Sequence, residues 1–573
     1  RITLVYRTRG LAGAAVGGET MRSERNRIWV GLLFAVLLTV LTFVSGGCVS
    51  AATTRYVNLG DSIQDVVDVA DHGDTVIVRD GTFTENVVVN VANLTLRSEN
   101  GSASTTVFAA VNTSDVFRVT ANSVTITGFT VRNATDSASS ASGIHLHVVQ
   151  HCSVSDNNAS GNYNGIYLYS SSNNTLMGNI ANSNYHCGIR LDSSSNNTLT
   201  NNSASNNSCG SWYSYGIYLE SSSNNNLTGN IASNNSVIGV HLISSSSNNL
   251  NSNRIYNNKY GISLGDSSNN NTIYDNDVSN NSFGSGIYLH SSSNNEVVAN
   301  NLHYNGDGIL IDYSDNNNIT GNTACNCTNA AIILRFSSKN TLSRNTVLGN
   351  PCGVFISVSS NNSLTSNTAS NNNRGIYLYS SSNNILTKNT ASNNYYGIDL
   401  YSSSNNNTLM GNTANSNNYC GIHLRNSSTN LIYNNYFDNT NNAQDDGNNI
   451  WNISKTAGTN IINGSYLGGN YWSDYTGKDT NGDGLGDTSV PYNSSGYIIN
   501  GGDWLPLVKA GAPPGRWDIN EDCTVNFIDL AILSAHWLET PTAPYPRYDI
   551  NEDGVVNFID LTILSAHWLE TTC

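Results

Sequence analysis

A short apolar phrase recurs along the central part of the chain. A small residue is followed by two aliphatic residues that alternate with variable ones, as in GIYLY, and most copies start 22 or 23 residues apart. This alternation predicts short strands whose aliphatic side chains point to one side while the variable ones face solvent. The thirteen copies begin at Gly143, Gly165, Gly188, Gly216, Gly239, Gly261, Gly286, Gly308, Ala331, Gly353, Gly375, Gly397 and Gly421.

The spacing of the phrase predicts how these strands are arranged. A period near 22 residues leaves room for three short strands and is typical of a solenoid in which each coil stacks on the one before. We therefore expect a mainly β fold, a right-handed single-stranded parallel β-helix with coils of about 22 residues. A leucine-rich horseshoe is the competing repeat architecture, but its asparagine and leucine spacing is missing.

This β-helix is expected to occupy residues 53–508. Residues 62–70 form a short amphipathic helical pattern, with Asp61 as its N-cap, that would cover the open strand edges of the first coil. Asparagines at equivalent turn positions, such as Asn173, Asn383 and Asn405, are expected to form hydrogen-bonded ladders and to tolerate left-handed backbone.

One stretch of the C-terminal tail is written twice. Residues 518–540 and 549–571 differ only at Cys523/Gly554, Thr524/Val555 and Ala531/Thr562. Each copy opens with carboxylates and amides at alternate positions and continues as an amphipathic helix, which is how a calcium loop is built. The predicted calcium ligands are Asp518, Asn520, Asp522, the Thr524 carbonyl and Asp529, then Asp549, Asn551, Asp553, the Val555 carbonyl and Asp560.

The doubled stretch resembles the dockerin family over residues 517–573, after a linker at residues 509–516. That resemblance implies a small α-helical calcium-binding domain that binds a cohesin module on a partner protein. Asp at loop position twelve agrees with the dockerin pattern, whereas Cys523 stands where a glycine is expected for a sharp turn. Near-identity of the two units implies an approximate twofold axis, so a partner would be able to dock in two orientations.

The sequence also indicates roles for two histidines and a cysteine of this domain. His536 and His567 lie in the repeated SAHWL and are interpreted as helix-end or interface residues rather than metal ligands. If the two helices of the dockerin-like domain pack antiparallel, the chain end lies beside the first loop, and Cys523 is expected to form a disulfide with Cys573.

A third candidate calcium loop follows the last coil. Residues 479–487 are rich in aspartate and glycine, and Asp479, Asn481, Asp483 and Asp487 provide oxygen ligands at short spacing. A simple Gly-Asp turn is the alternative interpretation.

Charge and composition indicate which kinds of molecule this protein is not expected to bind. The formal net charge is -16 and only 12% of residues are charged. A strongly acidic chain is poorly suited to nucleic acid or to anionic membrane surfaces. Regular apolar spacing argues against the disorder that so many Asn and Ser residues would otherwise suggest.

The N-terminal region predicts export. A basic stretch at residues 21–27 precedes an apolar run at residues 28–44 and a series of small residues, so residues 21–52 read as a signal peptide. Cleavage, lipidation at Cys48 and retention as a membrane anchor remain open, and residues 1–20 are interpreted as an extension of the gene prediction. The expected location is extracellular or at the cell surface.

Residues 60–506 resemble the pectin-lyase-like superfamily and the carbohydrate-associated β-helix repeats, including the NosD-type family. This resemblance implies contact with carbohydrate or cell-surface glycans. The outward tyrosines of the repeated strand are candidate sugar ligands, because aromatic rings stack on sugar rings. We single out Tyr167, Tyr218, Tyr288 and Tyr377.

Two alternatives assign chemistry to the β-helix. A polysaccharide lyase or glycoside hydrolase would use charged side chains on adjacent coils, with Asp192, Glu220, His290, Asp312 and Arg335 as candidates. A weaker alternative, from the NosD resemblance, is copper association through His145, His147, His151 and Cys152.

Overall fold

The computed structural model describes residues 52–208, 214–509, 516–543 and 545–570. The predicted signal peptide and the segment before it therefore lie outside the described residues, apart from Ala52. Within the described ranges no helix is both long enough and apolar enough to cross a membrane.

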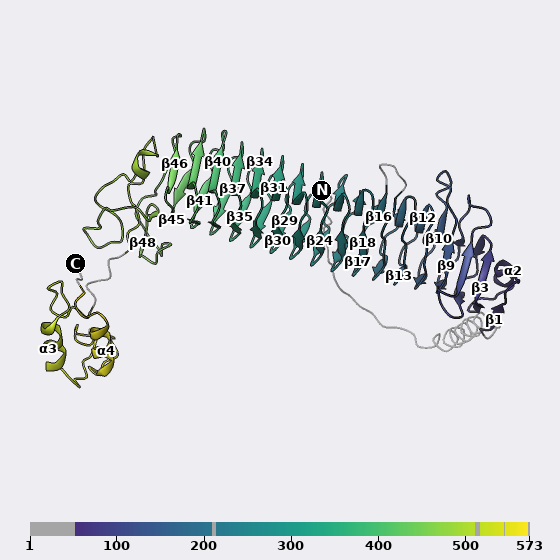
Figure 1. Ribbon diagram of the computed structural model, residues 1–573, viewed down its shortest axis with the longest axis horizontal. Helices are drawn as coiled ribbons and strands as arrows, with labels where there is room; N and C mark the ends of the chain where they lie inside the picture. Colours follow the sequence, from purple (N-terminus) through teal and green to yellow (C-terminus); the bar gives the residue numbers. More distant parts are fainter. Residues whose placement is uncertain (1–51, 209–213, 510–515, 544, 571–573) are drawn as a thin grey trace, which may run out of the picture. The chain divides into compact units, whose positions relative to one another are not determined.

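Residues 54–508 form a parallel β-helix, which confirms the predicted fold class (Figure 1). Three sheets run along the stack. Sheet I has 17 strands. They are β1 (Thr54–Val57), β2 (Thr75–Val78), β5 (Thr95–Ser98), β8 (Thr125–Thr127), β11 (Ser153–Ser155), β13 (Thr175–Met177), β15 (Thr198–Thr200), β17 (Asn226–Thr228), β20 (Asn249–Asn251), β23 (Thr272–Tyr274), β26 (Glu296–Val298), β29 (Asn318–Thr320), β32 (Thr341–Ser343), β35 (Ser363–Thr365), β38 (Ile385–Thr387), β41 (Thr408–Met410) and β44 (Leu431–Tyr433).

Sheet II has 16 strands and contains the repeated GIYLY phrase. Its strands are β4 (Val87–Val89), β7 (Phe117–Val119), β10 (Ser142–His147), β12 (Asn164–Tyr169), β14 (Cys187–Asp192), β16 (Tyr215–Glu220), β19 (Ile238–Ile243), β22 (Tyr260–Gly265), β25 (Ser285–His290), β28 (Asp307–Asp312), β31 (Ala330–Arg335), β34 (Cys352–Ser357), β37 (Arg374–Tyr379), β40 (Tyr396–Tyr401), β43 (Cys420–Arg425) and β46 (Ala443–Asp445). Equivalent residues pair coil by coil, as Tyr167 does with Arg190, so each outward position forms a column along the sheet.

Sheet III is interrupted. Its first part is β3 (Gly81–Thr84), β6 (Thr105–Phe108) and β9 (Thr130–Arg132). Its second part is β18 (Ile231–Ser233), β21 (Arg254–Tyr256), β24 (Asp277–Ser279), β27 (Asn301–His303), β30 (Thr323–Cys325), β33 (Thr346–Leu348), β36 (Thr368–Ser370), β39 (Thr390–Ser392), β42 (Thr413–Asn415), β45 (Tyr436–Asp438) and β49 (Tyr471–Trp472). The closing segment adds an antiparallel pair, β47 (Thr456–Ala457) and β48 (Tyr466–Leu467), and the 3-10 helix η1 (Ser494–Gly496).

Helix α2 (Ile63–Asp68) covers the first coil, but its N-cap is not the predicted residue. The Ser62 hydroxyl accepts from the Asp65 N–H at 3.2 Å. The carboxylate of Asp61 turns back instead and accepts from the backbone and the side chain of Asn58, both at 2.9 Å. A hydroxyl one residue later therefore satisfies the free N–H group at the helix start.

The interior of the coils is apolar where the phrase predicts it and amide-filled at the corners. Buried asparagines form ladders in which each amide oxygen accepts from the Asn of the preceding coil. Asn322, for example, accepts from the backbone N–H and the amide of Asn300 at 2.9 and 3.0 Å and donates to the Val297 carbonyl at 2.8 Å. Its ladder consists of Asn157, Asn179, Asn202, Asn230, Asn253, Asn276, Asn300, Asn322, Asn345, Asn367, Asn389, Asn412, Asn435 and Asn470.

The predicted ladder positions need a correction of one or two residues. Asn173 and Asn383 adopt left-handed backbone, with φ of 58° and 59°, whereas the residues that follow them, Asn174 and Asn384, make a ladder. The two asparagines of each pair have different roles. The first adopts the left-handed backbone of the turn, and the side chain of the second points into the coil and forms the ladder. At Asn405 the ladder residue is Asn407.

Two buried carboxylates end the ladders at the C-terminal side. Asp503 is fully buried and accepts from the Asn470 N–H at 2.7 Å and from the Trp472 indole at 2.8 Å. Asp445 accepts from the Asn449 amide at 2.8 Å. Burial raises the pKa of Asp503 to about 7 and that of Asp445 to about 6. The folded cap therefore favours the protonated form of each carboxyl more than the unfolded chain does.

We expect the wild-type protein to lose stability between about pH 4 and pH 7 relative to Asp503→Asn, and the difference to level off above pH 7. A carboxyl whose pKa is raised on folding stabilises the fold fully below its unfolded pKa, and this contribution is lost as the pH rises through the folded pKa. The difference should change by about 1.4 kcal/mol per pH unit in that window. Chemical unfolding at pH 5, 6, 7 and 8 measures it, and a difference that does not vary with pH would refute the assignment.

The dockerin-like domain consists of α3 (Phe527–Ala535) and α4 (Phe558–Ala566), each preceded by its loop. Their shared core includes Val525, Leu533, Val556 and Leu564. The two units are interlocked, because each loop bonds to the end of the other unit. The Val525 N–H donates to the Glu570 carbonyl at 3.0 Å and the Val556 N–H to the Glu539 carbonyl at 2.9 Å.

Candidate functional site

The two loops of the C-terminal domain have the same internal geometry. The Asp518 carboxylate accepts from the Cys523 N–H at 2.9 Å, and the Asp549 carboxylate accepts from the Gly554 N–H at 3.0 Å. At position twelve, Asp529 accepts from the Ile519 N–H at 2.6 Å, and Asp560 makes the matching bond to Ile550 at 2.7 Å. All four of these carboxylates are fully buried.

These donor sets fit a calcium ion. Two buried carboxylates per loop, joined by the amides and carboxylates of positions three and five, form an oxygen-only ligand set of the kind that calcium prefers. Asp549 Oδ1 is buried and has no hydrogen-bond partner, which leaves a carboxylate oxygen available for a cation. A bound calcium would neutralise this concentration of negative charge.

The sixth loop position is left-handed in both copies. Gly554 has φ of 82° and Cys523 has φ of 72°. The non-glycine residue costs about 1–2 kcal/mol there because its Cβ crowds the following carbonyl. Cys523 is disulfide-bonded. Its predicted partner, Cys573, lies outside the described residues, so this pairing stays a prediction. The thiols of Cys152, Cys325, Cys327, Cys352 and Cys420 are free.

An arginine from each unit binds the loop of the other. The guanidinium of Arg516 donates to the Asp549 carbonyl at 3.1 Å and pairs with Glu552 at 2.6 Å. Arg547 repeats this arrangement, donating to the Asp518 carbonyl at 2.7 Å and pairing with Glu521. These contacts follow the same approximate twofold symmetry as the sequence repeat.

The two histidines of the repeated SAHWL lie at helix ends and pack across the interface. His536 and His567 are the C-cap residues of α3 and α4. Each ring stacks at 3.8 Å on an aromatic residue just before the other unit's loop, Tyr548 for His536 and Trp517 for His567. This geometry agrees with their interpretation as interface residues.

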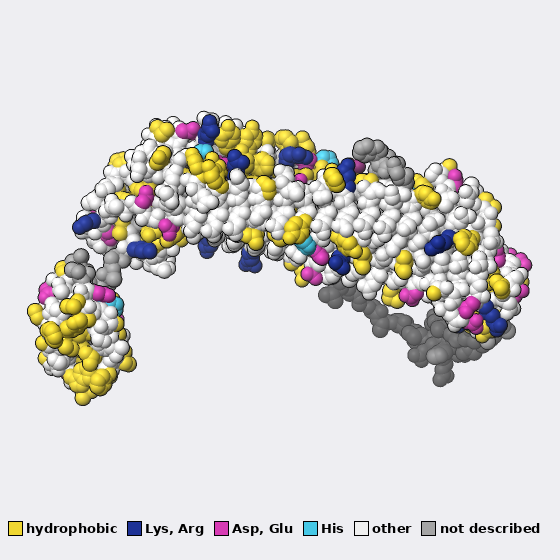
Figure 2. Space-filling view, viewed as in Figure 1, with side chains coloured by type: hydrophobic (Ala, Val, Ile, Leu, Met, Phe, Trp, Pro, Cys, Tyr) yellow, Lys and Arg dark blue, Asp and Glu magenta, His cyan; other side chains and the backbone are white. Residues whose placement is uncertain are grey.

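The surface of the domain exposes apolar side chains in symmetric pairs (Figure 2). Phe527 and Phe558 are 75% and 73% exposed, and their neighbours Ile528 and Ile559 are each 53% exposed. Exposed apolar groups of this size mark a surface that binds another protein.

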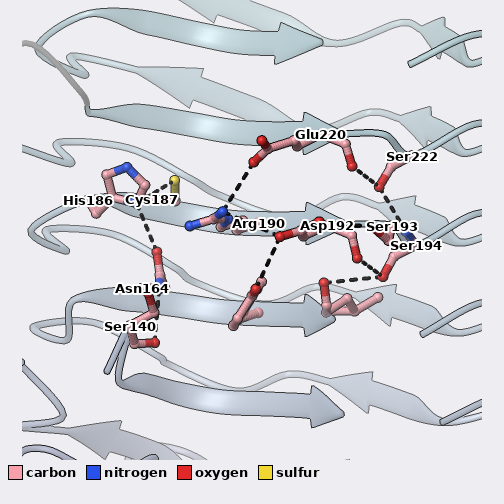
Figure 3. A network of polar contacts seen from close by, with 12 residues as sticks. Ser140, Asn164, His186, Cys187, Arg190, Asp192, Ser193, Ser194, Glu220 and Ser222 are labelled. Carbon is pink, nitrogen blue, oxygen red and sulfur yellow. Dashed lines mark hydrogen bonds and ion pairs between the residues drawn. The ribbon is translucent and has the colours of Figure 1, made fainter. Parts of the chain in front are cut away.

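On the β-helix, the first catalytic candidates form a network centred on Arg190 (Figure 3). Its guanidinium pairs with Glu220 at 3.1 Å and with Asp192 at 3.5 Å. The same group lies 5.2 Å from the ring centre of Tyr167 and 5.6 Å from that of Tyr218. Both carboxylates therefore balance the charge of a largely buried arginine.

The second set of catalytic candidates forms another closed network. Arg335 binds Asp312 through two bonds of 2.8 Å, and the His290 ring lies 3.4 Å from the same carboxylate. Burial alone would raise the pKa of Asp312, but the hydrogen bonds and charge of Arg335 outweigh it and hold this pKa below its usual range. A general acid for glycoside cleavage needs a raised pKa, so Asp312 is poorly suited to that role.

The four predicted sugar-binding tyrosines stack within the columns of sheet II. The ring of Tyr167 lies between His145 at 4.7 Å and Arg190, and that of Tyr218 lies between Arg190 and His241 at 5.6 Å. A sugar ring can reach only the edges and hydroxyl groups of these two. Tyr288 and Tyr377 stack on Tyr260 and Phe355.

The structure does not bring the proposed copper ligands together. His145 and His147 are neighbours on β10, with ring centres 5.3 Å apart, and Asp115 holds His145 at 2.8 Å. His151 and Cys152 precede β11 in a different sheet, and the Cys152 thiol is buried, which raises its pKa. These four side chains therefore do not fit copper as a set.

The third candidate calcium loop is closed by its own hydrogen bonds and by a lysine. Asp479 accepts from the N–H groups of Gly482 and Gly484 at 2.8 and 2.6 Å. Asp487 accepts from Thr480 N–H at 2.7 Å. Lys455 pairs with Asp483 at 2.5 Å, which already places one positive charge in the loop.

One polar cluster of sheet II was not singled out from the sequence. Asp399, only 2% exposed, is bound by Arg374 at 2.8 Å and by His423 Nδ1 at 2.9 Å. Asp399 and His423 are register partners on β40 and β43, whereas Arg374 is the first residue of β37. Aligning the coils position by position across strands β37, β40 and β43 would have revealed the cluster.

Comparisons with known proteins identify both parts of the chain. Residues 67–284 and 281–477 match the family described as periplasmic copper-binding protein (NosD), and residues 516–569 match the dockerin type I domain. No curated protein matches the sequence.

Among solved structures, three similar chains illustrate the range of β-helix proteins. The Dettilon tailspike protein is 15% identical, with a TM-score of 0.37, over 62% of this chain and 66% of its own. DFA-IIIase from Arthrobacter chlorophenolicus A6 is 13% identical, with a TM-score of 0.40, over 57% and 94%. Bacteriophage phi29 gene product 12 is 11% identical, with a TM-score of 0.47, over 66% and 69%.

The NosD match extends over most of the chain and coincides with the coils of the β-helix, and the dockerin match coincides with the two loop–helix units. The chain is therefore a member of the NosD family that carries a C-terminal dockerin type I domain.

Proposed function

We propose that this protein acts outside the cell or at its surface, where its dockerin binds a cohesin module in a calcium-dependent manner and its β-helix binds carbohydrate. The observation that carries the proposal is the pair of symmetric loops, each with two buried carboxylates and an exposed phenylalanine at the start of its helix. Calcium would be held by the ten ligands predicted from the sequence. The loop at residues 479–487 is a further candidate.

Carbohydrate binding by the β-helix is the less direct part of the proposal. Figure 2 shows charged and hydrophobic side chains along the upper edge of the β-helix, whereas the band below them is nearly free of charge. Polar groups interleaved with aromatic ones suit sugar hydroxyls and sugar ring faces. Retarded migration of the full chain in gels that contain one polysaccharide each would test this part.

A polysaccharide lyase or glycoside hydrolase remains the second candidate. It requires a side chain that is free to take or give a proton. Asp192, Glu220 and Asp312 are instead paired with arginines. The observed geometry therefore favours binding over catalysis.

Docking is tested at the exposed phenylalanines. We expect the double variant Phe527→Asp/Phe558→Asp to bind immobilised cohesin about 30-fold more weakly or worse, because central aromatic residues contribute about 2 kcal/mol or more to such interfaces. Each single variant should lose less, since the twofold symmetry leaves one intact copy. Surface plasmon resonance in calcium measures the affinities.

Leu59→Asp serves as the control, because Leu59 is 67% exposed but lies on the β-helix. Circular dichroism should show that the helices of the double variant persist. Unchanged cohesin binding by a folded double variant would contradict the assignment of this surface.

A further inference from the structure

A surface pocket of about 350 Å³ lies at the C-terminal end of sheet II. The segment around Tyr497, just after η1, forms one wall, and strands β43 and β46 provide the other. This volume is near the lower end of the range for small-molecule sites, about 300–1,000 Å³. The more accessible polar and aromatic residues that line it include Tyr419, His423, Arg425, Gln444, Asp446 and Tyr497.

The histidine of the pocket is held in a fixed orientation by a buried carboxylate of the preceding coil. His423 Nδ1 lies 2.9 Å from Asp399 Oδ1, and Arg374 binds the other oxygen of this buried carboxylate at 2.8 Å. In its neutral form, an imidazole that donates to this carboxylate through Nδ1 presents Nε2 as an acceptor. The ring also stacks on Tyr396 at 5.3 Å. A preorganised acceptor of this kind costs little entropy when it binds a hydroxyl group.

The remaining polar groups supply both donors and acceptors. The Arg425 guanidinium lies 5.7 Å from the Tyr401 ring centre and is otherwise exposed. Asp446 accepts from the Asn426 N–H through Oδ1 at 2.6 Å, which leaves Oδ2 for a ligand. Gln444 accepts from the Tyr419 hydroxyl through Oε1 at 3.4 Å, which leaves its amide N–H groups.

Tyr497 offers the open aromatic face that Tyr167 and Tyr218 lack. It is 55% exposed, and within the described part of the chain no other aromatic ring packs on it. Tyr419 is also partly open, at 38%, with one face on Tyr395. An aromatic face beside a few fixed polar groups is the usual composition of a site for a ring with an apolar face and a polar rim.

We propose that this pocket binds one ring of a neutral saccharide, with the ring on Tyr497 and its hydroxyl groups on His423, Arg425, Gln444 and Asp446. Hydroxyl groups both donate and accept, which matches this mixed set, whereas the carboxylate of Asp446 and the net charge of -16 disfavour an acidic sugar. The proposal rests on the carbohydrate part of the proposed function and gives it a location and a sugar class.

The test compares matched variants of the full chain. Isothermal titration calorimetry with cello-, xylo- and mannohexaose, and with an oligogalacturonate of similar length, gives the wild-type preference. We expect Tyr497→Ala and Arg425→Ala to weaken binding of the preferred neutral saccharide at least tenfold. Tyr304→Ala should change it less than twofold, because Tyr304 is equally exposed, at 53%, but lies on the turn after β27.

The outcomes separate this inference from the broader function. Neutral saccharide binding that survives in both pocket variants would overturn the location and leave carbohydrate binding intact. Binding of the oligogalacturonate alone would overturn the sugar class. If the wild type binds none of the saccharides, both the pocket and the carbohydrate part of the proposed function fail, while docking is unaffected. Thermal unfolding of each variant shows whether a loss reflects misfolding.

Discussion

Removal of calcium with EGTA is expected to unfold the dockerin domain and to abolish cohesin binding while leaving the β-helix folded. Each loop buries two carboxylates that repel one another without a cation. If each site has a micromolar Kd, 1 mM calcium stabilises the fold by about 4 kcal/mol per loop, or about 8 kcal/mol for both. A domain of this size has little other stability to lose. Surface plasmon resonance for cohesin and circular dichroism for the helices measure the two effects.

The matched variants for this experiment are Asp549→Ala and Glu296→Ala. Asp549 carries the buried oxygen without a hydrogen-bond partner, whereas Glu296 is an exposed acid on the β-helix. Only the first should lower calcium affinity, and an excess of calcium, but not of magnesium, should restore EGTA-treated protein. Full cohesin binding in EGTA would overturn the calcium assignment.

The second large effect is expected inside the β-helix. Asn322→Ala should destabilise the protein by about 2–6 kcal/mol, because it removes the side-chain partner of two buried groups, the Asn300 N–H and the Val297 carbonyl. Each such group costs about 1–3 kcal/mol. The free energy of unfolding in urea measures the loss.

Asn301→Ala is the control for the ladder. Asn301 directly follows the ladder residue Asn300 in the sequence, but its side chain is exposed on β27. It should change the free energy of unfolding by less than about 0.5 kcal/mol. Equal values for the two variants would show that the ladder contributes no more than a surface amide.

The fold was predictable because its signal is repeated many times. The copies of the apolar phrase place aliphatic residues at the same interior positions, such as Ile166 and Leu168 in one coil. A wrong assignment in one coil therefore does not change the predicted fold. Single positions were less predictable. Asp61 and Ser62 are both good N-cap residues, and only the bonds to Asn58 explain why the serine is used.

The functional sites also differ in how well the sequence predicts them. Loop ligands of the dockerin follow a fixed spacing, so the sequence was sufficient to place them. Side chains in a column of sheet II are different, because their neighbours come from other coils and compete for the same partners. The sequence indicated Tyr167 as a sugar ligand and Asp312 as a catalytic candidate, whereas in the structure His145 stacks on the tyrosine ring and Arg335 binds the carboxylate. The pocket at Tyr497 belongs to the closing segment, which contains no repeat.

In the dockerin, each loop–helix unit is held by an arginine that belongs to the other unit. Arg516 holds the second loop, Arg547 holds the first, and the strand-like bonds of Val525 and Val556 cross in the same way. A single loop–helix unit on its own would therefore keep its ligands but lose the clamp around them. Two such fragments would be able to restore each other's contacts by association, as in an exchanged dimer. The duplication in the gene is thus equivalent to a tethered homodimer, in which the short connection between the units guarantees the right partner.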